Sequence, residues 1–323
     1  MFKRFASIFL MFIMLFSLVI SASADGSDPG STPSHGNGQI FGVVPPKGKA
    51  NAMAAATNFA TSNLTYHSGA VMHSNTTHTI FWVPSGYSVN SSYISLINHF
   101  LIDVAAADNV TSNVYYSDKQ YYSVSGGVKY YITTTSTFGG AYLDTNPYPV
   151  SGCAPYMTGM TECLTDAQIQ AEIQRVITLK GWASNSTTEF FMFTANNVGS
   201  QAGSYYAFND YCAYHSWFGS VLYANMPYTG FSLSSCGVPQ SPNGNWAADS
   251  TISVLSHEHN ETITDPRGTG WYDGSGNENG DKCAWRFGSV SSSLKYNQTI
   301  NGHHYILQKE WSNSTARCVL SGW

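Results

Sequence analysis

The run SHEHNET at residues 256–262 constrains this chain more than any other stretch. The signature of many zinc hydrolases is H-E-x-x-H, and here Glu261 stands in the place of the second histidine. Positions i and i+4 of a helix lie on one face, one turn apart. We therefore predict a helix on which His257 and Glu261 bind one metal ion. Glu258 would act as general base on a water bound to that ion.

A third ligand must come from outside this helix, because a catalytic zinc normally has three protein ligands and a water. Asp265 continues the i, i+4, i+8 series, but it lies about 12 Å along the axis from His257. The chain must therefore leave the helix and return, and the Gly-rich acidic run at residues 269–285 is the obvious source of the ligand. Glu278 is the first choice and Asp281 the second.

One histidine and two carboxylates make a harder and more negative ligand set than two histidines. We expect zinc, held less tightly than usual, with manganese, iron or calcium as alternatives. His259, His303 and His304 are candidate hydrogen-bond donors to the ligands, although structural histidines are more frequent. The same two interpretations apply to His215, which could form part of a cleft wall.

The N-terminus has the pattern of an export signal. Lys3 and Arg4 precede an apolar run at residues 5–20, and Ala22-Ser23-Ala24 forms an A-x-A cleavage site. We predict a signal peptide at residues 1–24, a secreted, extracellular protein, and no transmembrane segment after cleavage. Loss of the two cations takes the formal charge from −5 to −7, which argues against nucleic acid as a partner.

The six cysteines favour disulfides in an exported protein, because their number is even and no C-x-x-C zinc motif occurs. Several pairings are formally open. The most local one would join Cys153 to Cys163, Cys212 to Cys236, and Cys283 to Cys318. The last of these bonds would stiffen the segment that follows the metal helix.

The chain divides into a leader and one domain. Residues 25–60 are rich in Gly, Pro, Ser, Asn and Ala and are interpreted as a flexible leader or pro-segment, and residues 61–323 as a single zincin-like domain. Periodicity and caps predict strands at 79–83, 189–194 and 221–226, and helices at 93–104, 165–181 and from Asp249-Ser250 to Pro266. Residues 114–122 and 128–138 are predicted to form strands or a hairpin around Gly126-Gly127. This order indicates an α/β or α+β fold, a mixed sheet with packed helices and a zincin-like active-site helix.

The chain resembles the plant phosphate-induced or Exordium-like secreted proteins and their bacterial relatives. The resemblance is carried by Ser256-His257-Glu258 with Glu261, Thr264-Asp265-Pro266, Gly270-Trp271-Tyr272, Glu278, Asp281 and Cys283, and by Tyr66-His67-Ser68-Gly69 with Ile80-Phe81-Trp82. It implies an exported extracellular or cell-wall-associated protein without a firmly assigned reaction.

The residues favour a secreted metallohydrolase, most readily a metallopeptidase that acts on an extracellular protein or peptide. Residues 221–226 are the candidate edge strand to which an extended peptide would add. The alternative is a non-catalytic extracellular binding protein with a structural metal site. Its partner would be a protein or a cell-wall carbohydrate, contacted through the abundant tyrosines.

Overall fold

The fold is built on a mixed six-stranded sheet. The computed structural model describes residues 34–35, 39–40, 42–50, 62–290 and 292–322, so the predicted signal peptide lies outside the described residues. The strand order is β3-β13-β14-β10-β5-β8, with four parallel strands from β14 to β8 and antiparallel pairing of β13 with β14 and of β3 with β13. Their bounds are Val43–Val44, Ala213–Phe218, Val221–Met226, Thr188–Thr194, Asn75–Trp82 and Ser136–Asp144.

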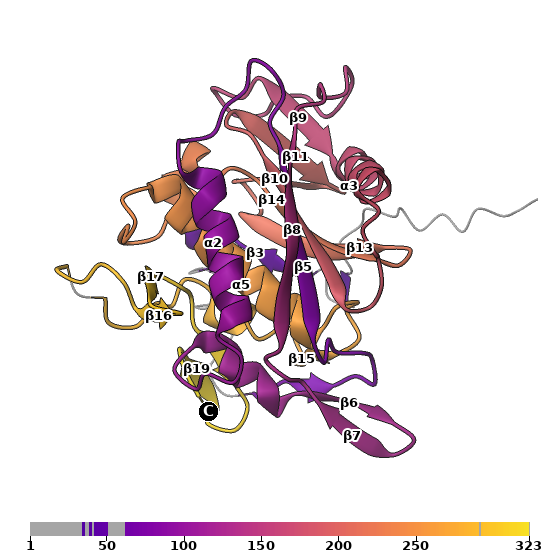
Figure 1. Ribbon diagram of the computed structural model, residues 1–323, viewed down its shortest axis with the longest axis vertical. Coiled ribbons are helices and arrows are strands. Elements are labelled where there is room, and N and C mark those ends of the chain that lie inside the picture. Colours follow the sequence, from indigo (N-terminus) through magenta and orange to yellow (C-terminus); the bar gives the residue numbers. More distant parts are fainter. Residues whose placement is uncertain (1–33, 36–38, 41, 51–61, 291, 323) are drawn as a thin grey trace, which may run out of the picture.

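Helices cover both faces of this sheet (Figure 1). α2 (Tyr93–Ala106) and α5 (Trp246–Thr264) lie side by side on one face, and α3 (Asp166–Lys180) lies on the other. The central strand β10 is buried at all seven positions because it is covered from both sides. None of the described helices is both long enough and apolar enough to cross a membrane.

Shorter elements surround this centre. A small sheet has the order β12-β11-β9, and five two-stranded ladders pair β1 with β2, β4 with β15, β6 with β7, β16 with β17, and β18 with β19. The bounds are β1 Ser34–His35, β2 Gln39–Ile40, β4 Thr65–Tyr66, β6 Tyr122–Ser125, β7 Val128–Tyr131, β9 Glu162–Thr165, β11 Val198–Ala202, β12 Tyr205–Tyr206, β15 Trp271–Tyr272, β16 Gln298–Ile300, β17 His303–Tyr305, β18 Glu310–Ser312 and β19 Arg317–Val319. The short helices are η1 Val114–Gln120, η2 Thr229–Phe231, α4 Leu233–Cys236 and η3 Asp281–Cys283.

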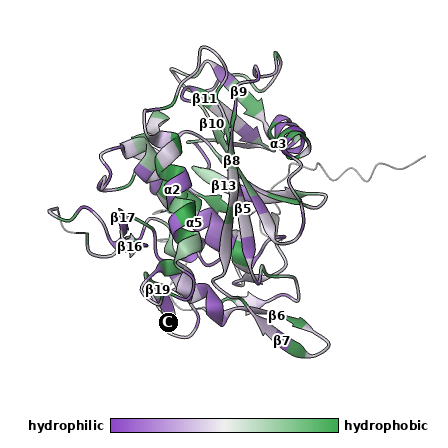
Figure 2. Ribbon diagram, viewed as in Figure 1, coloured by the Kyte–Doolittle hydropathy of each residue, from purple (hydrophilic) through white to green (hydrophobic). Residues whose placement is uncertain are grey.

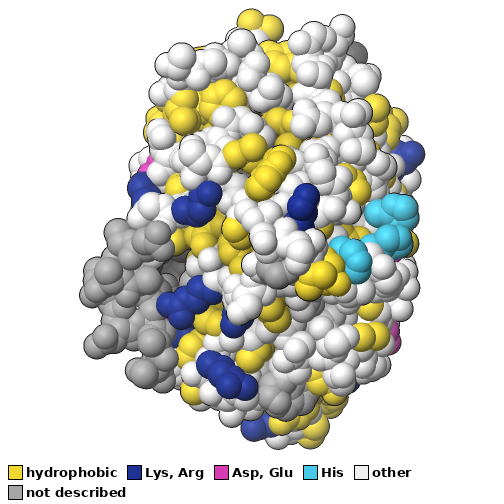
Figure 3. All heavy atoms as spheres, turned by 90° about the vertical axis from the view of Figure 1, so that its left-hand side faces the viewer, with side chains coloured by type: hydrophobic (Ala, Val, Ile, Leu, Met, Phe, Trp, Pro, Cys, Tyr) yellow, Lys and Arg dark blue, Asp and Glu magenta, His cyan; other side chains and the backbone are white. Residues whose placement is uncertain are grey.

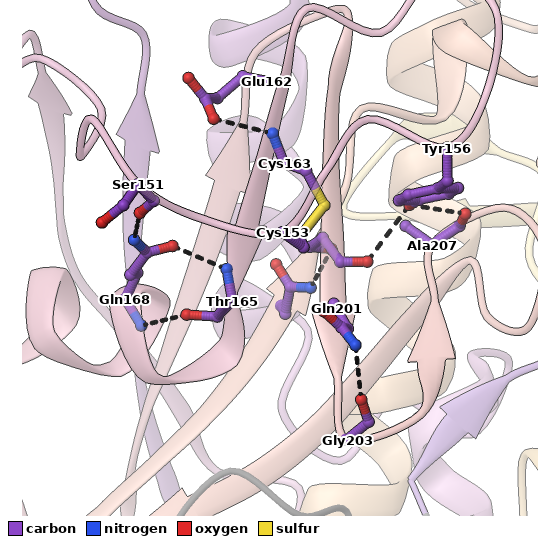
Figure 4. The surroundings of a disulfide bond; sticks show 12 residues. Ser151, Cys153, Tyr156, Glu162, Cys163, Thr165, Gln168, Gln201, Gly203 and Ala207 are labelled. Carbon is purple, nitrogen blue, oxygen red and sulfur yellow. Dashed lines mark hydrogen bonds between the residues drawn. A yellow bond between two sulfur atoms is a disulfide. The ribbon is translucent and has the colours of Figure 1, made fainter.

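The predicted α3 is confirmed together with its ends. The Thr165 side chain accepts from the Gln168 amide, and the Gln168 side chain accepts from the Thr165 amide, which forms a capping box. Gly181 ends the helix with a left-handed φ of 63°. Figure 4 shows this cap beside the disulfide that joins Cys153 and Cys163 across the start of β9. The local sequence therefore sets both ends of this element.

The six cysteines form three disulfides in the most local pairing: Cys153 with Cys163, Cys212 with Cys236, and Cys283 with Cys318. This fits an extracellular setting. The α+β expectation is also confirmed, since a mixed sheet is packed with helices.

Three expectations about the elements are wrong. Residues 114–120 form the 3-10 helix η1 rather than a strand, with Val114, Tyr115, Ser117 and Asp118 buried. β14 is an interior strand between β13 and β10, so it is not the edge to which a peptide could add. Within the leader, residues 42–50 are not a flexible tether, because Val43 and Val44 pair with Tyr214 and Ala213 and pack into the core.

Candidate metal centre

The helix α5 runs through the interior of the protein. Asn245 caps it by accepting a 3.1 Å hydrogen bond from the Ala248 amide, four residues before the predicted cap at Asp249. Every residue from Ala247 to Thr264 is buried, and Figure 2 shows hydrophilic stretches along this helix. Buried polar side chains need partners, so this face of α5 must be satisfied by other elements.

His257 and Glu261 lie one turn apart, as predicted, and the segment after α5 returns to them. The His257 Nε2 atom is 2.9 Å from Glu261 Oε1 and 3.8 Å from Asp281 Oδ1. The Asp281 amide donates a 2.8 Å hydrogen bond to Glu261 Oε1, which holds the start of η3 against the helix. We call His257, Glu261 and Asp281 the metal triad, because one ligand atom from each lies within 4.8 Å of the others.

The backbone approaches the metal triad closely at Gly280. A Cβ atom at this position would lie 2.8 Å from His257 Nε2 and 2.9 Å from Glu261 Oε1. Contacts this short are not tolerated, so a glycine is needed directly before Asp281. The close approach is what lets η3 deliver a carboxylate to the helix.

The metal triad leaves several buried atoms without hydrogen bonds. Both ring nitrogens of His257 and Glu261 Oε2 lack a hydrogen-bond partner, and the 2.9 Å contact between His257 and Glu261 lacks hydrogen-bond geometry. Unsatisfied buried atoms of this kind are rare in native proteins. A divalent cation would satisfy these converging nitrogen and oxygen atoms. The residues present therefore fit a metal.

A second set of side chains lies beside the metal triad, and we call His215, Glu258 and Glu278 the flanking group. His215 Nδ1 lies 3.1 Å from Glu258 Oε2 and forms a hydrogen bond with it. His215 Nε2 lies 3.8 Å from Glu278 Oε1, which lacks a hydrogen-bond partner. His215, Glu258 and Glu261 also lie close enough to share an ion. The His215 imidazole, however, already has a hydrogen bond in this set, whereas that of His257 has none.

The geometry favours the second choice of third ligand over the first. Asp281, the second choice, lies within reach of His257 and Glu261, whereas Glu278 faces His215. The other Glu278 oxygen, Oε2, accepts a 2.8 Å hydrogen bond from the Gly42 amide. The two acids therefore face different histidines, Glu278 facing His215 and Asp281 facing His257.

The structure gives His259, His303 and His304 partners outside the metal triad. His259 forms a 3.2 Å hydrogen bond with the Tyr115 hydroxyl, and burial lowers its pKa to about 3. The exposed His303 lies 2.8 Å from Asp103 Oδ2, and His304 stacks on Tyr296. These three histidines therefore make structural contacts and do not donate hydrogen bonds to the metal triad.

His215 is the site residue that sequence reasoning undervalued. It lies on β13, which packs against α5. β13 runs antiparallel to β14 and pairs His215 with Ala224. His215 contacts α5 only because the order of the strands places β13 against that helix. A local sequence pattern around a single histidine in a Tyr-rich strand does not reveal such a contact.

The electrostatics of the site are those of crowded acids in a dry interior. Burial raises the pKa of Glu258 well above its usual range, and the charge of Glu261 raises it further. Burial also raises the pKa of Glu278, again together with Glu261. The pKa of His257 is lowered by burial, but Glu261 and Asp281 outweigh that effect and raise it well above 6.5.

The charge of the site calls for a cation. Four carboxylates, from Glu258, Glu261, Glu278 and Asp281, surround two imidazoles. Acidic side chains are scarce on the surface shown in Figure 3, where cationic and uncharged ones predominate. A divalent cation would offset the mutual repulsion of these acids and so stabilise the cluster.

No profile of a known protein family matches the chain, and no curated protein or solved structure matches it either. The geometry of the site is therefore what supports a function.

Proposed function

We propose that this protein is a secreted metallohydrolase of the peptidase class, a bacterial relative of the Exordium-like proteins. The observation that carries the proposal is the metal triad, in which the buried His257 and Glu261 of α5 converge with the partly buried Asp281 of η3. Both ring nitrogens of His257 and one oxygen of Glu261 lack a hydrogen-bond partner there. Glu258, the residue next to His257, lies beside this triad and is held by His215. The combination of three ligands and an adjacent carboxylate is the minimum that metal-assisted hydrolysis needs.

A bound divalent metal would supply a Lewis acid that acidifies a water molecule. Zinc is the metal we propose, with manganese, iron or calcium as alternatives for a set of one imidazole and two carboxylates. Glu258 would take the proton of that water. Burial raises the pKa of Glu258 well above the usual range of a glutamate.

Metal content and hydrolysis of an unfolded protein substrate test this proposal together. Protein secreted by a host grown with zinc should contain stoichiometric metal by plasma mass spectrometry. Chelation should remove both the metal and the hydrolysis of labelled casein, and added metal should restore both. A metal-free protein that gains nothing from zinc, manganese, iron or calcium would rule the proposal out.

One observation favours a second candidate, a non-catalytic extracellular binding protein with a structural ion. His257, Glu258, Glu261 and Glu278 are all 0% exposed, and structural ions are closed by protein ligands whereas catalytic ones keep an open position. This candidate predicts stoichiometric metal whose removal unfolds the protein, without hydrolysis of any peptide bond. Residues 42–44 of the N-terminal segment contact Glu258 and Glu278 and help to close the site. A structural ion requires this closure to be permanent, whereas a catalytic ion requires the segment to leave.

A further inference from the structure

The strand beside the site comes from the leader, although its two valines pack into the core. β3 is two residues long and covers the edge of β13. The Cys212 amide donates a 2.7 Å hydrogen bond to the Val44 carbonyl, and the His215 amide donates a 2.8 Å hydrogen bond to the Gly42 carbonyl. Without residues 42–44, β13 would be the open edge of the sheet, and it carries His215.

The same short segment contacts the acids of the flanking group through its backbone. The Gly42 amide donates a 2.8 Å hydrogen bond to Glu278 Oε2, and the Val44 amide donates a 3.1 Å hydrogen bond to Glu258 Oε1. These donors are peptide groups, so an extended peptide of another sequence could make the same hydrogen bonds. In this chain they occupy an oxygen of the proposed base.

Residues downstream of β3 hold the segment in place. The Trp285 indole donates a 2.7 Å hydrogen bond to the Pro45 carbonyl. Lys47 Nζ donates hydrogen bonds of 3.1 and 3.0 Å to the carbonyls of Leu233 and Gly237. The contacts continue beyond β3, so the binding surface is longer than two residues.

The packing also defines which residues fit. A Cβ atom at Gly42 would lie 2.5 Å from His215 Nδ1, and the φ of Gly42 is +62°, so the imidazole requires glycine there. Val44 is fully buried. A ligand therefore needs glycine against His215 and a small apolar residue two positions later.

We propose that the edge of β13 is a binding groove for peptides of the pattern Gly-x-Val, which pair with it as a short strand, and that residues 42–50 fill it as an intramolecular blocking segment whose last four residues are helical. The inference rests on the proposed peptidase function and names where its substrate would lie. It also accounts for the complete burial of Glu258 and Glu278, because the strand that contacts them is the part that would leave.

A chain that folds intact and is then cut tests the proposal. The recognition sequence of a site-specific protease replaces residues 53–59, the protein is folded with its disulfides, and half of the sample is cut. Gel filtration and mass spectrometry follow the release of the segment. Fluorescence anisotropy then measures binding of a labelled peptide of residues 42–50, GVVPPKGKA, to cut and uncut protein.

We expect the cut protein to bind this peptide about tenfold or more tightly than the uncut protein. The matched peptide with alanine in place of Gly42 should bind about tenfold to a hundredfold more weakly, because its methyl group meets the His215 ring. If the cut segment stays bound during gel filtration, the same chain with Gly42→Ala should lose it. The proposed groove would be rejected if the wild-type peptide and its Gly42→Ala variant bound equally well. It would also be rejected if the cut segment were lost equally from the wild-type and Gly42→Ala chains.

Metal content, measured on the same samples, separates this inference from the proposed function. Stoichiometric metal with no peptide binding to segment-free protein would reject the groove and leave the metallohydrolase standing. Selective peptide binding without metal would support the groove and reject the hydrolase. If the protein contains stoichiometric metal and also binds the peptide selectively, casein hydrolysis should rise once the segment is released.

Discussion

The amide of Val44 donates a 3.1 Å hydrogen bond to Oε1 of Glu258, across a sequence separation of 214 residues. This contact joins the leader to the residue next to His257. It makes Glu258 a carboxylate with both oxygens engaged, since His215 holds the other one. Glu258 therefore lies beside the metal triad without being one of its ligands.

The two acidic residues after α5 should differ in their effect on metal affinity. We expect Asp281→Asn to weaken metal binding about a hundredfold or more, because it removes a ligand charge from the metal triad. Glu278→Gln should change affinity much less, since Glu278 faces His215 and Gly42. Competition with a chromophoric chelator measures both affinities. A larger loss in Glu278→Gln would make Glu278 the ligand instead.

Replacing the proposed base should separate chemistry from metal binding. We expect Glu258→Gln to keep its metal while kcat for a peptide substrate falls by about a hundredfold or more, because the amide cannot take a proton. Glu189→Gln is a matched control. Glu189 is also buried, but it accepts a hydrogen bond from Thr262 and belongs to neither the metal triad nor the flanking group, so a neutral amide should replace it with little loss of activity. Unchanged kcat in Glu258→Gln would remove this residue from the mechanism.

Two disulfides should have different consequences for the site. Cys283 and Cys318 close a loop with a sequence separation of 35, and replacing both by serine should cost about 3–4 kcal/mol of unfolding free energy. Metal affinity should fall as well, because Cys283 ends η3, which begins at Asp281.

The disulfide between Cys153 and Cys163 is the control for that experiment. Its sequence separation is 10, so its loss should cost about 2–3 kcal/mol. It lies at β9, on the part of the structure that holds α3 (Figure 4). Metal affinity should stay unchanged, and an equal fall in both variants would show that affinity follows global stability alone.

A buried histidine away from the metal triad should make stability depend on pH. Burial lowers the pKa of His78 to about 4, where its ring stacks with Phe190 and lies close to Trp182. The unfolded chain keeps a pKa of about 6.5 and so binds more protons than the folded chain below that pH. His78 therefore costs no stability above about pH 6.5 and destabilises the folded state increasingly as the pH falls.

The variant His78→Phe removes this titration. We compare the free energy of unfolding of the variant with that of wild type at each pH. The difference should shift in favour of the variant by about 1–2 kcal/mol when the pH is lowered from 7 to 5. Urea denaturation at the two pH values gives the comparison, and each protein serves as its own reference at pH 7. A difference between the two proteins that is the same at both pH values would contradict the assigned pKa.

Local sequence patterns predicted the elements with strong local signals. The capping residues Thr165 and Gly181 marked α3, and the spacing of His257 and Glu261 marked one face of α5. η1 was mistaken for a strand because its tyrosines favour strands in general, whereas here Tyr115 packs against His259 on α5.

What the sequence could not reveal depends on contacts between distant segments. β14 is an interior strand because β13 pairs with its outer edge and β3 pairs with the outer edge of β13. No local sequence pattern encodes this pairing. His215 enters the site for the same reason. The composition of residues 25–60 suggested flexibility, but Val43 and Val44 are enough to form a strand when β13 offers an open edge.

The most direct test of the central claim is a crystal structure of the zinc-loaded protein with anomalous data collected at the zinc edge. The account predicts one strong anomalous peak within bonding distance of His257 Nε2 and of carboxylate oxygens of Glu261 and Asp281. A peak bound by His215 and Glu278 instead, or no peak in protein that has been given excess zinc, would contradict it.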